Sequence, residues 1–201
     1  MARLLTREFF AREAVIVAPE LLNVVLVGRG ATGRIVEVEA YAGESDAASH
    51  AFRGPTARNA TMFGLPGRLY VYFTYGMHHC ANVVCGKVGV AGAVLVRALA
   101  PLDGLETMRR RRGGAKAPRE LCSGPAKLCQ ALGIAGVDDG ADLVTGEGGL
   151  ALVDDGTPAP DDPWCGRRVG LSARVGGAGA LLWRFAVPGD PNVSRHAWRV
   201  E

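Results

Sequence analysis

Apolar residues gather in short runs along this chain, and segments that contain Gly, Pro or Asn separate the runs. Runs rich in β-branched and aromatic residues predict strands at residues 24–28, 34–41, 69–74, 81–85, 93–99, 166–175 and 181–187. Residues 29–33 contain Gly and predict a hairpin between the first two strands. We therefore expect an α+β fold, with a mostly antiparallel, curved sheet that is open like a partial barrel and surrounded by helices.

Helix start and stop signals are fewer. They predict helices at residues 6–13, 19–22, 101–112 and 123–133, with Thr6 as a cap, Pro19 and Pro125 in first turns and Gly133 as a stop. These helices are expected to pack on the sheet. Residues 43–67 lack sustained periodicity, and a loop of about 25 residues in a compact domain is typical of a functional segment.

The strand predicted at residues 34–41 has one apolar face, formed by Val36, Val38 and Ala40. The other face carries Ile35, Glu37, Glu39 and Tyr41. An acid beside an aromatic ring suits an enzyme that holds a planar heterocycle and activates water against the atom attached to it. A second aromatic cluster follows at residues 70–77. The alternative for Glu39 alone is an ordinary surface carboxylate.

Arg97 interrupts the apolar strand predicted at residues 93–99. A charged side chain is costly to bury alone, so Arg97 needs an acid or a cavity beside it. Glu39 is the candidate partner, and the guanidinium is expected to keep Glu39 ionised near neutral pH.

Length and composition limit the class of protein. A chain of 201 residues, 48% of them hydrophobic and 28 of them Gly, predicts one globular domain over residues 1–201 with many tight turns. No apolar run reaches the length of a membrane span, so no membrane association is expected. The N-terminus lacks the long apolar core of a signal peptide, and a cytoplasmic location is the expectation.

The cysteines suggest reduced thiols. Cys80, Cys85, Cys122, Cys129 and Cys165 form an odd set without a C-x-x-C pair, which fits small core residues better than disulfides. The run His78-His79-Cys80 lacks the spacing of a metal site, because neighbours on a strand point to opposite faces. We therefore expect no metal ion.

Charge is distributed unevenly along the chain. Residues 97–127 hold eight Lys or Arg against three acids, whereas residues 135–162 hold eight acids and no Lys or Arg. A basic segment suits a polyanion, and an acidic one would be repelled by it. For the four arginines at 109–112, a solvated helix C-terminus is an equal alternative. Free N–H groups beside Lys127 could hold a phosphate or simply face water.

An ordered set of short motifs carries a resemblance that covers about residues 21–185. The set comprises Arg34-Ile35-Val36-Glu37-Val38-Glu39-Ala40-Tyr41, Arg58-Asn59, Met62-Phe63, Pro66-Gly67, Tyr70-Val71-Tyr72, Tyr75-Gly76-Met77, Asn82-Val83, Arg97-Ala98-Leu99 and Leu121-Cys122-Ser123-Gly124-Pro125. Each motif is weak alone, but the ordered set is highly specific. It resembles the alkyladenine (3-methyladenine) DNA glycosylase family, bacterial type, whose members lack a long N-terminal extension.

The resemblance implies roles at the matching positions. Glu39 falls where the family keeps the acid that deprotonates the attacking water, and Arg97 falls where a side chain helps to hold that water. Tyr41, His50 and Tyr72 fall where the flipped base is sandwiched, and His50 can also donate a hydrogen bond to the nucleotide. Outside this resemblance, packing would be the simpler interpretation of a lone His or Tyr.

Other matching positions concern the duplex and the pocket floor. Tyr75 falls where the family inserts a side chain into the gap left by the extruded nucleotide, and Asn82 where an asparagine disfavours the exocyclic amino group of guanine. The backbone around Val175 resembles the family's third contact to the water. Candidate DNA contacts are Arg58, Asn59, Met77 and Lys127.

The resemblance implies a monofunctional DNA glycosylase of base excision repair. Such an enzyme flips alkylated or deaminated purines (3-methyladenine, 7-methylguanine, hypoxanthine, ethenoadenine) out of duplex DNA, hydrolyses the N-glycosidic bond and leaves an abasic site. No lysine stands where a Schiff base would form, and no metal or organic cofactor is needed. We expect a cytoplasmic monomer that associates with the nucleoid by binding DNA and has no obligate protein partner.

Two other classes stay open. A non-catalytic protein that recognises distorted DNA would lack the acid or Arg97, and this chain has both. A metal-dependent hydrolase would lose its activity in a chelator.

Overall fold

The computed structural model describes residues 2–74, 76, 78–114 and 117–194. The strands are β1 (Arg3–Leu4), β2 (Val25–Gly28), β3 (Ala31–Tyr41), β4 (Leu69–Thr74), β5 (His78–Val84), β6 (Ala93–Asp103), β7 (Ala151–Asp154), β8 (Trp164–Gly166) and β9 (Arg184–Ala186). The helices are α1 (Arg7–Phe10), α2 (Ala14–Glu20), α3 (Leu105–Arg111), α4 (Pro118–Leu121) and α5 (Pro125–Leu132). Short 3₁₀ helices lie in the connections: η1 (Gly43–Ser45), η2 (Ala60–Phe63), η3 (Gly136–Asp138), η4 (Glu147–Gly149) and η5 (Ala173–Ala180).

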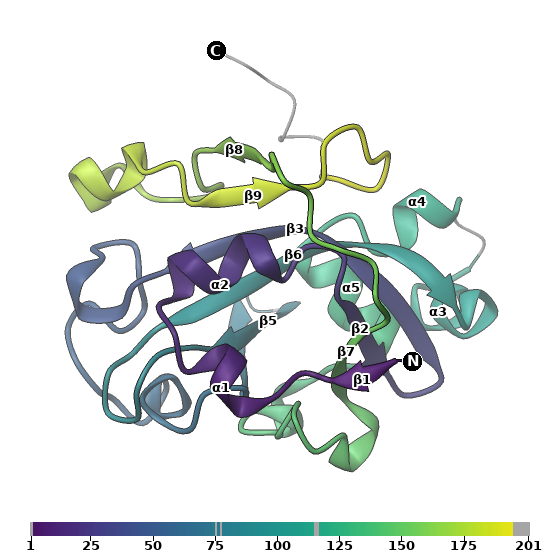
Figure 1. The fold of residues 1–201 in the computed structure, drawn as a ribbon, viewed down its shortest axis with the longest axis horizontal. Helices are drawn as coiled ribbons and strands as arrows, with labels where there is room; N and C mark the ends of the chain where they lie inside the picture. Colours follow the sequence, from purple (N-terminus) through teal and green to yellow (C-terminus); the bar gives the residue numbers. More distant parts are fainter. Residues whose placement is uncertain (1, 75, 77, 115–116, 195–201) are drawn as a thin grey trace.

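The strands of the described residues form one curled sheet with helices packed around it (Figure 1). The strand order is β1-β7-β2-β3-β6-β5-β4, and β9 joins the sheet through β3 and carries β8. The pairs that build this order are antiparallel. The predicted α+β class with a curved, mostly antiparallel sheet is confirmed.

Helices bury apolar stripes against the sheet and form the main core. Val17 of α2 and Leu128 and Leu132 of α5 are inaccessible to solvent and belong to the same cluster. In α5 the local signals agree with the packing, because Pro125 occupies the first turn and Gly133, at a φ of 70°, ends the helix as predicted.

The first two helices differ from the prediction at their boundaries. α1 ends at Phe10, earlier than the expected residue 13. Pro19 does not start a helix: it lies in the last turn of α2, which begins at Ala14. The apolar stripe of α2 outweighs the proline signal, since the missing N–H of a proline removes only one hydrogen bond there.

Pro101 also fails to start a helix. It pairs with Gly33 of β3, and β6 continues to Asp103. α3 begins only at Leu105, after Gly104 has turned the chain at a φ of 74°. Cross-strand pairing along the centre of the sheet therefore outweighs the local preference for a helix.

A β-bulge in β3 changes which side chains share a face. The pairing of β3 with β6 shifts register between Ile35 and Glu37 and shifts back between Glu37 and Val38, so the regular alternation of side chains is interrupted there. Ile35 therefore packs in the main core with Val38, whereas Val36 packs in a separate cluster with Ala98 and Ala186. The predicted faces of Ile35 and Val36 are wrong, because a strict two-residue alternation ignores the bulge.

The strand predicted at residues 166–175 is wrong, because β8 (Trp164–Gly166) shares only Gly166 with it, and the strand predicted at residues 181–187 is shorter than expected. β8 ends at Gly166 and β9 covers Arg184–Ala186, and η5 occupies much of the Gly-rich stretch between them. Glycine supplies no side chain to pack on a sheet, so this stretch lacks a reason to stay extended. The sequence signals also miss β7, which lies in the acidic segment, and the short helix α4.

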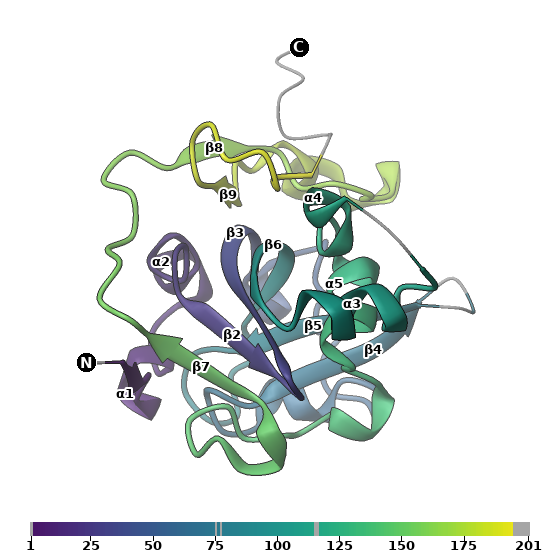
Figure 2. The same cartoon turned by 90° about the vertical axis from the view of Figure 1, so that its right-hand side faces the viewer.

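The acidic segment, residues 135–162, is tied to arginines from the N-terminal part of the chain. The ion pairs are Arg3–Asp154 at 3.0 Å, Arg7–Asp142 at 2.6 Å, Arg29–Asp138 at 2.5 Å and Arg34–Asp155 at 2.7 Å. Figure 2 shows β7, from this segment, beside β2, with which it pairs. The acidic segment therefore fastens the N-terminal elements to the sheet edge.

The hairpin between β2 and β3 is tighter than predicted. Gly28 pairs with Ala31, so the turn consists of Arg29 and Gly30 alone. Gly30 has a φ of 74°, which a two-residue hairpin turn requires and which glycine adopts without steric cost.

Gly43 begins the long loop and is expected to tolerate no side chain. It has a φ of 60°, and a Cβ at this position would lie 2.0 Å from the carbonyl oxygen of Ala91. We expect Gly43→Ala to lower the free energy of unfolding by about 2–4 kcal/mol, because the backbone must move and also keep a left-handed conformation. Urea denaturation followed by circular dichroism measures this loss.

Gly30→Ala is the matched control. Gly30 also has a positive φ, but a Cβ there would meet no heavy atom within 4 Å. Gly30→Ala should lower the free energy of unfolding by about 1 kcal/mol, because only the left-handed backbone conformation is unfavourable for alanine there. Equal losses for the two variants would contradict the steric argument.

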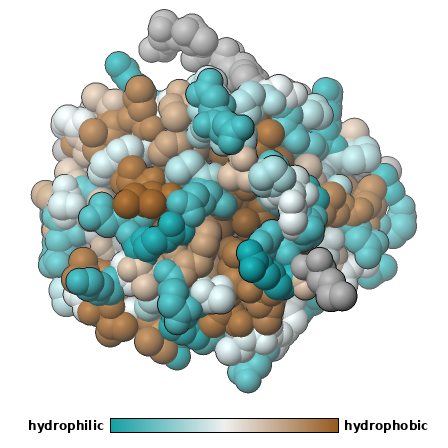
Figure 3. Space-filling view, in the orientation of Figure 1, coloured by the Kyte–Doolittle hydropathy of each residue, from teal (hydrophilic) through white to brown (hydrophobic). Residues whose placement is uncertain are grey.

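The surface mixes hydrophobic and hydrophilic side chains, as the face in Figure 3 shows. Exposed large hydrophobic residues such as Ile16, Phe52 and Val137 come from different elements. Scattered residues of this kind are ordinary on soluble folds. Within the described ranges, every helix is too short or too polar to cross a membrane.

Candidate active site

A cavity of about 430 Å³ opens between the central strands and the loops near residues 48–50 and 169–175. Its lining includes Tyr41, His50, Tyr72, Asn82, Arg97 and Val175. These residues come from β3, the long loop, β4, β5, β6 and η5, so the curled sheet brings distant parts of the chain to one place. All six carry roles predicted from the sequence.

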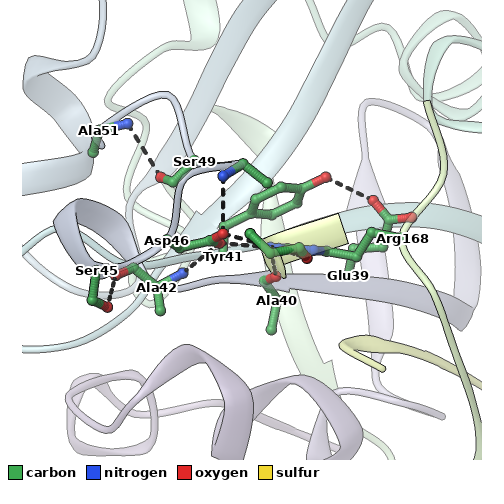
Figure 4. A network of polar contacts seen from close by, with 11 residues as sticks. Glu39, Ala40, Tyr41, Ala42, Ser45, Asp46, Ser49, Ala51 and Arg168 are labelled. Atoms are coloured by element: carbon green, nitrogen blue, oxygen red, sulfur yellow. Dashed lines mark hydrogen bonds and ion pairs between the residues drawn. The ribbon is translucent and has the colours of Figure 1, made fainter. Parts of the chain in front are cut away.

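Glu39 lies directly behind the wall of this cavity and is fully buried. Its Oε1 accepts a hydrogen bond from the Val169 backbone N–H at 2.7 Å and lies 3.1 Å from Arg97 Nη1. Its Oε2 accepts a hydrogen bond from the Tyr41 hydroxyl at 2.8 Å (Figure 4). A carboxylate has about four acceptor positions. The contacts among described residues use three of them, two on Oε1 and one on Oε2.

Arg97 connects Glu39 to a second buried acid. Its Nε donates to Glu37 Oε1 at 3.0 Å, while its Nη1 faces Glu39. The expected pairing of Arg97 with Glu39 is confirmed. Burial by itself would lower the pKa of Arg97, but the carboxylates of Glu39 and Glu37 outweigh it and raise the pKa above its usual value. The guanidinium therefore stays charged.

Glu37 is the site residue that sequence reasoning missed. It is fully buried, and it accepts hydrogen bonds from the backbone N–H of Ser194 at 2.8 Å and from the Ser194 hydroxyl at 2.9 Å. Through Arg97 it links the end of the described chain to Glu39. The signal that could have identified Glu37 is its place two residues before Glu39 on one strand.

Tyr41, Tyr70, Tyr72 and His50 form an aromatic cluster at the cavity. The rings of His50 and Tyr72 lie 4.4 Å apart at 75°, and those of Tyr70 and Tyr72 lie 5.7 Å apart at 34°. Burial raises the pKa of Tyr41, and the neighbouring Glu39 carboxylate raises it further. Tyr41 therefore keeps its hydroxyl proton and donates a hydrogen bond to the Glu39 carboxylate.

His50 is expected to be neutral at pH 7. Burial and the charge of Arg58 lower its pKa, and its Nδ1 lies 3.2 Å from the Tyr70 hydroxyl. The unfolded chain binds a proton at His50 near pH 6.5, the folded chain only at lower pH, so acidification from pH 7 to 5 costs stability. We predict that His50→Asn loses less stability over this interval than the unaltered protein, as measured by urea denaturation at each pH.

The interval from pH 8 to 7 provides the control for this prediction. It lies above the ordinary pKa of histidine, so the two proteins should change equally there. A His50→Asn variant that follows the unaltered protein from pH 7 to 5 would show that His50 titrates alike in both states.

Asn82 and Val169 both line the cavity. Asn82 is 4% exposed, and its Nδ2 donates to the backbone oxygen of Tyr70 at 3.1 Å, which fixes its amide plane. The backbone group that reaches Glu39 belongs to Val169, and Val175 lines the cavity. The Gly-rich composition nearby offers no packing signal that would distinguish these two positions.

Asn59 braces the long loop. It is 2% exposed, and its Nδ2 donates to the backbone oxygens of His50 at 2.9 Å and Gly54 at 3.1 Å. The side chain thereby holds His50 at the cavity. The predicted DNA contact of Asn59 would require this bracing to open.

Among the described residues, two further candidate DNA contacts, Arg58 and Lys127, are not part of the cavity lining. Arg58 donates to the backbone oxygen of Phe73 at 3.2 Å, next to the β4–β5 turn. Lys127 donates to the hydroxyl of Ser123 at 3.3 Å, at the start of α5. Tyr75 and Met77, predicted to enter or contact the duplex, lie outside the described residues.

The thiols and histidines form no metal centre within the described ranges, where no three His, Cys, Asp or Glu side chains are close enough to share an ion. Cys80, Cys85, Cys122 and Cys129 are buried and Cys165 is exposed, all as free thiols.

Known proteins resemble this chain over most of its length. The sequence model of the methylpurine-DNA glycosylase (MPG) family matches residues 8–191. A protein of Burkholderia lata, named as a candidate 3-methyladenine DNA glycosylase, is 56% identical over 94% of this chain and 90% of its own length. Proteins of the same name from Streptomyces avermitilis and Carboxydothermus hydrogenoformans are 51% and 47% identical. They cover 94% and 96% of this chain and 90% and 99% of their own length.

Proposed function

Because the chain belongs to the methylpurine-DNA glycosylase family, we propose that it releases alkylated and deaminated purines from duplex DNA and leaves abasic sites. As a member of this family it is a hydrolase of N-glycosyl bonds that acts in DNA repair. The proposed substrates are 3-methyladenine, 7-methylguanine, hypoxanthine and ethenoadenine. The observation that carries the proposal is the buried Glu39 carboxylate, which contacts Tyr41, Arg97 and Val169 in the wall of an aromatic cavity.

Access to the base requires flipping. A purine stacked in a duplex cannot reach a cavity of this kind, so the nucleotide must rotate out, and damaged pairs open at lower cost. The flipped base would lie against the rings of Tyr41, Tyr72 and His50. We propose that Tyr75 fills the gap in the duplex and opposes the return of the nucleotide.

Glu39 then supplies the chemistry. Its carboxylate would orient a water molecule toward the anomeric carbon and accept a proton as the N-glycosidic bond breaks. The same carboxylate would stabilise the positive charge that develops on the sugar. Arg97, the Tyr41 hydroxyl and the Val169 N–H keep the carboxylate in place.

Charged and neutral bases should differ in rate. 3-Methyladenine and 7-methylguanine carry a positive charge and can leave without a proton, whereas hypoxanthine and ethenoadenine need one. His50 favours its neutral form and Tyr41 and Tyr72 hold their protons, because burial shifts the pKa of each in that direction. We therefore propose that the cationic purines are released faster.

Single-turnover base release tests the proposal. Duplexes that each carry one defined lesion are mixed with excess protein, and the abasic product is cleaved by alkali and quantified. Release of 3-methyladenine or 7-methylguanine, with unmodified duplex untouched, would support the function. If no lesion is released while the duplexes still bind, the protein is a non-catalytic reader of distorted DNA.

The partner is proposed to be double-stranded DNA, bound by a monomer without a further protein. Phosphates supply most of the affinity in such complexes, so binding should weaken as salt rises and depend little on sequence. Titration of a labelled duplex at several salt concentrations measures how binding depends on salt. Sedimentation of the free protein measures whether it is a monomer.

A further inference from the structure

The buried ion pair of Asp46 and Arg168 is neither a cavity-lining element nor part of the chemistry described above. We propose that it is a positioning element for base release, which sets the Val169 N–H on Glu39 and the ring of Tyr41 in the cavity wall. The inference rests on the proposed function. Asp46 and Arg168 touch no reacting atom in it, so they act through Val169 and Tyr41.

The pair joins β3 and the start of the long loop, which are close in the sequence, to a segment that lies 122 positions after Asp46. Arg168 donates to both carboxylate oxygens of Asp46, at 2.5 and 2.9 Å, and each side chain is fully buried. Arg168 also donates to the backbone oxygens of Ala40 at 2.9 Å and Ala178 at 3.0 Å. The planar guanidinium thus connects β3, the long loop and the segment after β8, in a geometry that a flexible ammonium cannot reproduce.

Asp46 fixes the start of the long loop on its side of the pair. Its carboxylate accepts a hydrogen bond from the backbone N–H of Ala42 at 3.2 Å (Figure 4) and another from the backbone N–H of Ala48 at 3.0 Å. Ala42 directly follows Tyr41, and Ala48 lies two residues before His50. The loop that carries one cavity wall is therefore folded back onto the strand that carries the other.

Arg168 reaches the catalytic groups through its neighbours. Its guanidinium carbon lies 4.7 Å from the ring centre of Tyr41, within the range of a cation–π contact. Ala40, whose carbonyl it binds, stands between Glu39 and Tyr41 in β3. The next residue along the chain, Val169, donates its N–H to Glu39. Movement of Arg168 would therefore displace groups on both sides of the carboxylate.

Stability alone is a weak reason for such a pair. Charges taken fully out of water lose hydration, and apolar residues of similar size often replace buried ion pairs without loss of stability. The pair of Arg34 and Asp155 fastens distant segments at the surface, with side chains 20% and 30% exposed, and avoids most of that penalty. A requirement for fixed geometry explains why Asp46 and Arg168 are buried instead.

Single-turnover release of 7-methylguanine at saturating protein tests the inference. We expect Arg168→Met to slow release about 100-fold and Asp46→Asn about 10-fold, because displacement of a catalytic group by about 1 Å costs rate on this scale. The loss should persist at every protein concentration, since it lies in the rate at saturation and not in DNA affinity. Arg34→Met is the matched control, expected to melt at lower temperature but to release at the unaltered rate.

A purely structural role predicts a different result. Arg168→Met would then melt earlier, as Arg34→Met does, yet release at the unaltered saturating rate at a temperature where circular dichroism shows it folded; that result would overturn the inference. If Arg168→Met does not fold, Arg168→Lys decides, because it keeps the charge and loses the planar contacts. A slow but folded Arg168→Lys supports positioning, and an unaltered rate refutes it.

The two proposals fail in distinguishable ways. If the unaltered protein releases none of the lesions, the proposed function is wrong, and the positioning role is wrong with it. If the unaltered protein is active and the folded variants at Asp46 and Arg168 match its saturating rate, only the positioning role is wrong.

Discussion

Glu39→Gln is expected to bind a lesion-containing duplex as tightly as the unaltered protein and to release the base about 10²–10⁴ times more slowly. The amide keeps the shape of the carboxylate but cannot accept a proton from water. It also presents an N–H₂ group to donors, so the contacts from Tyr41, Arg97 and Val169 cannot all persist. Single-turnover release and equilibrium binding to the same duplex measure the two quantities separately.

Glu147→Gln is the control for that comparison. Glu147 is an exposed carboxylate of η4, so its substitution makes the same change in net charge without touching the cavity. Its release rate should match that of the unaltered protein. Undiminished release by Glu39→Gln would remove Glu39 from the mechanism and leave the cavity without its proposed base.

Arg97→Met is expected to have the largest effect on stability. Arg97 is buried between Glu37 and Glu39, and an apolar replacement leaves two buried carboxylates without this cation. Breaking a buried ion pair on one side costs about 3–5 kcal/mol. Urea denaturation should show this loss, and release should fall with it because Glu39 loses its main charged contact.

Arg3→Met shows what loss of an exposed pair costs. The Arg3 side chain is 79% exposed and pairs with Asp154 at the sheet edge. Such pairs contribute about 0–1 kcal/mol, so this variant should be nearly as stable as the unaltered protein. Similar losses for Arg97→Met and Arg3→Met would mean that the central cluster is solvated and not buried as described.

The pairing of Arg97 with Glu39 could be predicted because the need for an acidic partner is visible in the short apolar run around Arg97. An arginine inside an apolar strand needs an acid, and the chain places a carboxylate on another such strand. Glu37 could not be singled out in the same way. Its partner Ser194 lies 157 positions away, and nothing in the sequence marks that serine as a neighbour.

The contact from Val169 could not be predicted for a different reason. It comes from a backbone N–H, which almost every residue possesses, so the side chain carries no signal for it. Pro101 illustrates the opposite case: its signal for a helix start is strong, but pairing with Gly33 decides the local structure. Register within the sheet, like backbone contacts, is a property of the folded chain and not of a short window of sequence.

The ion pairs between the acidic segment and the N-terminal arginines also make the two ends of the sheet different in charge. β1 and β7 lie at one end of the sheet order, whereas β5 and β4, which contribute to the cavity, lie at the other. A duplex that collides with the β1–β7 edge meets Arg3 and Arg34 already neutralised by Asp154 and Asp155. Such an encounter gains little attraction and should end quickly. We therefore expect the acids to affect the rate of productive association, because they would make collisions in the wrong orientation brief.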